Sequence, residues 1–164
     1  MTELRLRRDD SDKKRYLIEG VGELRLGKWY QRGGVISDTG GRSWELKSSA
    51  WKLSAEAVDE AGATGARYEP LGVLKRGGEL ELADGTLFEL KPSSAWKNRY
   101  ALWYGDTELA SIETKGWTGS EVAVTLAEGA SVAPLPLLMA CWLVRRFGED
   151  DAAAASGGGA AAGG

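Results

Sequence analysis

The chain has 164 residues, a formal net charge of -3 at pH 7, no histidine and one cysteine. Its length indicates a single domain, and the acidic excess argues against a nucleic-acid binder, which needs a basic face to contact phosphates. Without histidine, triad, zinc and two-histidine iron chemistry are disfavoured, and one cysteine forms neither an internal disulfide nor a cysteine metal cluster. We therefore expect no metal, no cofactor and no catalytic activity.

The N-terminal residues are charged and contain no apolar stretch of the kind that a secretory signal requires, so we expect a cytoplasmic protein. Basic and acidic residues are interleaved from Arg5 to Arg15. This mixture is typical of a solvated strand end and loop, with contact to anionic lipid as the alternative.

Between residues 3 and 126, short segments alternate apolar with polar residues and are separated by turn-forming residues. This period of two is typical of antiparallel strands. Strands are predicted at 3–8, 15–19, 23–30, 34–37, 42–47, 50–54, 72–76, 78–82, 86–91, 99–105, 108–114 and 121–126. About a dozen strands predict an all-β barrel or sandwich.

Segment 32–52 is repeated at 76–97, and 12 of 21 aligned positions are identical when Pro92 is treated as an insertion. In each copy a glycine-containing turn, at 39–41 or 83–85, joins two predicted strands. The duplication therefore indicates two matching hairpins in the wall of one barrel.

Alternation within these hairpins divides the side chains between two faces. The dry face is predicted to hold Trp44, Leu46, Phe88 and Leu90, and the wet face Glu45, Lys47, Glu89 and Lys91. Five of the seven tryptophans are predicted in the core: Trp44, Trp51, Trp96, Trp103 and Trp142. Trp29 and Trp117 are the best candidates for exposure.

The last part of the chain breaks the pattern, because it is apolar without interruption from Leu135 to Val144. Prolines at the start of this segment and Arg145, Arg146 and Gly148 at its end predict a helix over about 134–147, with the arginines explained by the helix dipole. The apolar stretch 132–144 is shorter than the ~20 residues that cross a bilayer. A barrel of a dozen strands leaves a central void that a helix fills, so we expect this helix in the core.

The remaining residues, 149–164, are acidic and then only Ala, Ser and Gly. They offer nothing to bury, which predicts a disordered tail after a folded domain over 1–148.

These features resemble the tubby C-terminal-like superfamily, which includes LURP-one-related proteins and phospholipid scramblases. The likeness rests on the hairpins "ISDTGGRSWELK" and "LELADGTLFELK", on "YALWYGDTELASIETKGW" and on the final "PLPLLMACWLVRR". It covers residues 16 to 148. It implies a closed 12-stranded antiparallel barrel around a hydrophobic C-terminal helix.

The resemblance also implies a function, because tubby proteins bind phosphoinositide headgroups through a Lys-x-Arg pair. The spacing occurs at Lys97 and Arg99, and Lys75 and Arg76 lie at a neighbouring strand end. The calcium segment and cysteine-rich stretch of scramblases have no counterpart here, so calcium binding and lipid scrambling are not implied.

We therefore expect a non-catalytic intracellular module, monomeric and without a transmembrane span. Its leading predicted partner is an anionic phospholipid headgroup at a membrane surface. Two alternatives remain, a structural or protein-interaction domain and membrane attachment through the C-terminal helix.

Overall fold

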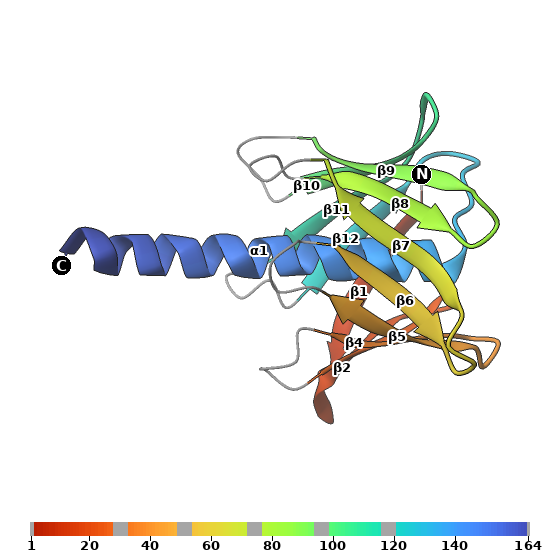
Figure 1. Cartoon of the computed structure of the whole chain (residues 1–164), viewed down its shortest axis with the longest axis horizontal. Helices are drawn as coiled ribbons and strands as arrows, with labels where there is room; N and C mark the ends of the chain where they lie inside the picture. Colours follow the sequence, from red (N-terminus) through yellow and green to blue (C-terminus); the bar gives the residue numbers. More distant parts are fainter. Residues whose placement is uncertain are drawn as a thin grey trace.

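In the computed structural model, the chain forms a closed antiparallel barrel of twelve strands around one helix (Figure 1). The structure describes residues 2–27, 33–48, 54–71, 77–93, 99–115 and 121–148, and beyond these the backbone of the helix to residue 163. The elements are β1 Thr2–Asp9, β2 Asp12–Ile18, β3 Gly22–Leu26, β4 Gly34–Asp38, β5 Ser43–Ser48, β6 Ala55–Asp59, β7 Thr64–Pro70, β8 Gly78–Leu82, β9 Leu87–Pro92, β10 Arg99–Tyr104, β11 Thr107–Lys115, β12 Glu121–Leu126 and α1 Pro134–Gly163.

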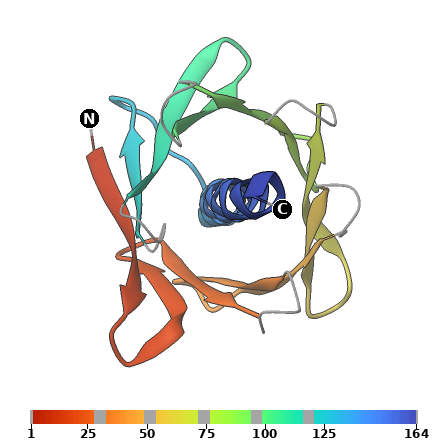
Figure 2. The ribbon, with the colours of Figure 1, turned by 90° about the vertical axis from the view of Figure 1, so that its left-hand side faces the viewer.

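Each strand pairs with its neighbours along the chain, and β12 pairs with β1. Figure 2 shows the resulting ring of strands around the helix. The predicted barrel with its central helix is therefore confirmed.

The helix fills the barrel with apolar side chains on every side. All residues from Leu135 to Val144 are buried, as the uninterrupted apolar run predicts. Strand residues pack around them from the inner face of the wall, and they include the four predicted from the repeat: Trp44, Leu46, Phe88 and Leu90. The inward positions predicted for the two hairpins are therefore confirmed.

Two glycines allow the core to pack this closely. A Cβ on Gly22 would lie 2.2 Å from the backbone oxygen of Ser37 and 3.1 Å from a methyl of Leu138. A Cβ on Gly65 would lie 2.7 Å from Nε1 of Trp44. All three distances are shorter than ordinary van der Waals contact, so these positions require the absence of a side chain.

The turns between hairpin strands follow the predicted chemistry. Gly41 and Gly85 have φ angles of 87° and 89°. Asp38 Oδ1 accepts hydrogen bonds from the backbone N–H groups of Gly40 and Arg42, both at 2.9 Å. An aspartate therefore fixes the first repeat's turn, and Gly41 supplies its left-handed backbone.

Strands β6 and β7 were not predicted from the sequence. No strand was predicted between residues 55 and 70, where β6 and β7 lie. Their inward positions include Ala55, Ala57 and Ala66, all buried. Alanine has little strand preference and gives a weak apolar alternation, so the period of two was not recognised. The strands predicted at 50–54 and 72–76 lie almost wholly outside the described residues, and Ser54 is not in a strand.

The prediction that Trp103 is a core residue was wrong. Trp103 is partly exposed, and its ring lies 5.2 Å from the Nζ atom of Lys91 on the neighbouring strand. The register shifts between Leu102 and Trp103, so simple alternation does not hold at this point. Trp44 and Trp142 are buried as predicted, whereas four tryptophans lie outside the described residues: Trp29, Trp51, Trp96 and Trp117.

The helix is longer than predicted, since its backbone continues to Gly163. Arg145 and Arg146 are therefore not in its last turn, and the helix dipole does not explain them. Instead, the guanidinium of Arg146 lies 5.4 Å from the ring of Trp142, and that of Arg145 lies 4.8 Å from the ring of Tyr16. The alanines after residue 151 favour the helix, and the disorder of 149–164 stays a prediction.

Candidate functional site

Three of the four basic residues implied by the resemblance lie outside the described residues: Lys75, Arg76 and Lys97. Arg99 is on β10, where its Nη2 donates to Oε2 of Glu113 at 2.9 Å. Lys115 Nζ lies 3.4 Å from the same oxygen. The hydrogen bond from Arg99 lowers the pKa of Glu113, so the carboxylate stays ionised and balances the Arg99 charge.

Most basic side chains on the described outer wall have a carboxylate partner within 4 Å. These are Arg5, Arg15, Arg25, Arg67, Lys91, Arg99 and Lys115. Among the described strands and turns, six other basic residues make no ion pair: Arg7, Arg8, Lys13, Lys14, Arg42 and Lys47. Arg42 instead packs 4.9 Å above the ring of Trp44. Four of the six belong to one hairpin, β1–β2.

We call Arg7, Arg8, Lys13 and Lys14 the basic hairpin. Figure 2 shows the β1–β2 hairpin, in red, standing out from the ring of strands. All four side chains are exposed. The sequence pattern drew attention to this segment, but its interleaved acids suggested that its charges cancel.

Aspartates hold the turn of this hairpin in place. Asp9 Oδ1 accepts hydrogen bonds from the backbone N–H of Ser11 at 2.9 Å and from its hydroxyl at 2.8 Å. These bonds lower the pKa of Asp9. Asp12 Oδ1 accepts a hydrogen bond from the backbone N–H of Lys14 at 3.0 Å. The turn that presents the cations is therefore ordered by its own side chains.

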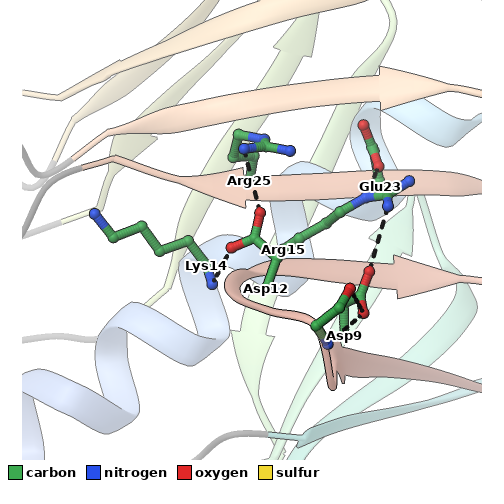
Figure 3. A network of polar contacts seen from close by, with 7 residues as sticks. Asp9, Asp12, Lys14, Arg15, Glu23 and Arg25 are labelled. Carbon is green, nitrogen blue, oxygen red and sulfur yellow. Dashed lines mark hydrogen bonds and ion pairs between the residues drawn. The ribbon is translucent and has the colours of Figure 1, made fainter.

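The same aspartates also form ion pairs with arginines on the adjacent strands. Asp9 Oδ2 lies 3.3 Å from Nη1 of Arg15, and Asp12 Oδ2 lies 3.3 Å from Nη1 of Arg25. Arg15 also donates to Glu23. Figure 3 shows these pairs, with the Lys14 side chain extending away from them. The acids that appear to neutralise the hairpin in sequence thus neutralise Arg15 and Arg25.

Only Asp10, of the hairpin's three acids, has no ion-pair partner among the described residues. The hairpin therefore carries four cations but only one carboxylate without an ion-pair partner among the described residues. This local excess of positive charge contrasts with the net charge of -3 of the whole chain.

The basic hairpin lies at the end of the barrel from which the helix leaves. Tyr16, on β2, accepts a hydrogen bond on its hydroxyl from Nη2 of Arg145 at 3.0 Å. Arg8 is the register partner of Tyr16 on β1, and Lys14 is two residues before Tyr16 on the same face. Arg8 and Lys14, both exposed, therefore lie at the same end of the barrel as Arg145 of the helix.

Exposed large apolar side chains in the described part of the chain are spread over four strands and one turn: Leu17, Val35, Leu71, Leu87 and Tyr104. Within the same residues, no three Asp, Glu or Cys side chains are grouped to hold a metal ion. None of the described helical residues forms a span that is long and apolar enough to cross a bilayer.

The basic hairpin has the donors that bind phosphate oxygens, since guanidinium and ammonium groups form charge-assisted hydrogen bonds with them. No family model, curated protein or solved structure matches the chain.

Proposed function

We propose that the protein is a non-catalytic intracellular module that binds anionic phospholipid headgroups at a membrane surface through its basic hairpin. The supporting observation is the cluster of four exposed cations without ion pairs on an ordered turn. Each basic side chain close to an anionic membrane contributes about 1 kcal/mol of binding free energy. Phosphate is the chemical group that such a cluster recognises best, and phosphoinositides present it at the highest charge.

The location of the hairpin gives the proposed complex an orientation. The hairpin stands out sideways from the ring of strands, so its turn, and not the end of the barrel from which the helix leaves, would meet the membrane (Figure 2). The apolar residues of the helix, from Leu135 to Val144, are all buried against the strands. Membrane contact therefore needs no helix insertion and depends on charge.

Vesicle flotation tests this proposal. The full chain is mixed with vesicles of phosphatidylcholine alone or with added phosphatidylserine, over a series of salt concentrations. We expect flotation with the anionic vesicles only. The floated fraction should decrease as the salt concentration rises, because the screening length falls to about 10 Å at 0.1 M. Absence of flotation at low ionic strength would refute the proposal.

A competition arm separates a membrane ligand from a soluble one. Inorganic phosphate and glycerophosphoserine carry the same phosphate chemistry without a surface. We expect the protein to stay on the vesicles when either is added at constant ionic strength, because several cations contact the surface together. Displacement by dilute phosphate would indicate a soluble anion as the ligand.

A further inference from the structure

Strand β1 changes its partners along its length. Residues Thr2 to Leu6 pair with β12, whereas Arg7 to Asp9 pair with β2. Strand β2 ends at Ile18 and turns towards β3. On the side of Thr2–Leu6 that faces β2, no described strand pairs with the backbone. The closed barrel therefore contains an open strand edge five residues long.

A groove of about 1010 Å³ lies beside this edge. Its lining includes Glu3, Leu4 and Arg5 of the open edge, Arg7 and Arg8 of the basic hairpin, and Glu19 and Gly20 of the turn after β2. The groove adjoins the open edge, and open edges are the places where sheets recruit additional strands.

We propose that this edge pairs with the same edge of a second copy of the chain, in antiparallel orientation about a two-fold axis. The edge sequence, Thr-Glu-Leu-Arg-Leu, is complementary to itself. With Leu4 opposite Leu4 of the second copy, Glu3 lies opposite Arg5 of the second copy and Arg5 opposite its Glu3. Glu3 and Arg5 of one chain also pair with each other, at 3.0 Å, so the four charges of the dimer would form one network. Opposite charges at directly paired positions stabilise a sheet.

The charges select this register over its neighbours. A shift of two residues in one direction places Glu3 opposite Glu3, and in the other direction Arg5 opposite Arg5. A one-residue slip places the outward-facing Arg5 opposite the partly buried Leu4, which disrupts the division between faces. The register centred on Leu4 also uses all five residues of the open edge.

None of the four cations of the basic hairpin takes part in the two charge pairs, although Arg7 and Arg8 also line the groove. Lys13 and Lys14 do not line it, so they can be changed without altering the proposed interface. The strand edge is short, so the dimer is weak and depends on concentration. It differs in this respect from the monomer expected from the sequence alone.

Sedimentation equilibrium of the full chain over a wide concentration range tests the dimer. All chains carry Glu121→Gln, because Glu121 lies 2.8 Å from Arg5 and would oppose a carboxylate there. In this background, Glu3→Arg leaves arginines opposite each other, and we expect the dimer to weaken at least about tenfold. Adding Arg5→Glu reverses both charges, which restores opposite pairs in the same register and should restore the dimer.

Three results would overturn the proposal. The first is a parent chain that stays monomeric up to its solubility limit. The second is a dimer whose affinity Glu3→Arg leaves unchanged. The third is a dimer that Glu3→Arg weakens and Arg5→Glu does not restore, although circular dichroism shows that every chain is folded. A chain in which only Lys13 and Lys14 are changed to glutamine should dimerise normally while floating less with anionic vesicles, which separates this test from that of headgroup binding.

Discussion

The substitution Leu138→Arg is expected to abolish folding. Leu138 has no exposed surface and lies in the middle of the helix segment enclosed by the barrel. Among the described residues, the only buried charged side chain is Arg146, so no carboxylate is available to pair with an arginine at this position. An unpaired buried charge costs several kcal/mol, comparable with the roughly 5–15 kcal/mol that stabilises a typical domain.

Two companion variants identify the cause of the loss. Leu138→Ala removes the same side chain without adding charge and should cost about 2–5 kcal/mol while leaving a folded protein. Leu17→Arg makes the same replacement on the outer wall, where Leu17 is 37% exposed, and should change stability by only about 0.5 kcal/mol. Urea unfolding followed by circular dichroism measures all three. A folded Leu138→Arg protein would contradict burial of the helix in the barrel.

Replacing Arg7, Arg8, Lys13 and Lys14 by glutamine should nearly eliminate flotation with anionic vesicles. Four cations at about 1 kcal/mol each correspond to roughly a 1,000-fold loss of affinity. The fold should be unaffected, because the four side chains are exposed and make no ion pairs among the described residues.

A matched variant controls for the change in net charge. Four other cations lie on strands β5, β7, β9 and β11 of the barrel wall: Lys47, Arg67, Lys91 and Lys115. Changing these four to glutamine lowers the net charge equally but leaves the basic hairpin intact. We expect this variant to bind vesicles within a few-fold of the wild-type affinity. Equal losses in the two variants would show that total charge, not the hairpin, controls binding.

Much of the fold could be predicted because strong local patterns coincide with the tertiary structure. Trp44 and Leu46 alternate with charged residues, and the all-apolar run from Leu135 to Val144 is explained only by complete burial. Strands β6 and β7 were not predicted because the residues on their inner faces make sense only in the assembled barrel. Small residues such as Ala57 and Ala66 suffice on their inner faces because the helix fills the space, and a single strand's sequence does not show that.

The basic hairpin was harder to predict because its charge depends on pairing across strands. In the sequence, Asp9 and Asp12 lie among the cations and seem to neutralise them. In the fold, they pair with Arg15 and Arg25, and the latter is on a different strand. The free cations become visible only when the strand register is known.

The most direct test of the central claim is to locate the surface that touches the membrane. The single cysteine, Cys141, is buried, and burial raises the pKa of its thiol to about 12, so it does not react with labels near neutral pH. An environment-sensitive fluorophore can therefore be attached to Ser11→Cys in the basic hairpin's turn. The control is Ala61→Cys, in the exposed turn between β6 and β7.

With phosphatidylserine vesicles, the fluorophore at position 11 should shift its emission to the blue, while the one at position 61 should not change. High salt should abolish the shift. A shift at position 61 without one at position 11 would contradict membrane binding through the basic hairpin.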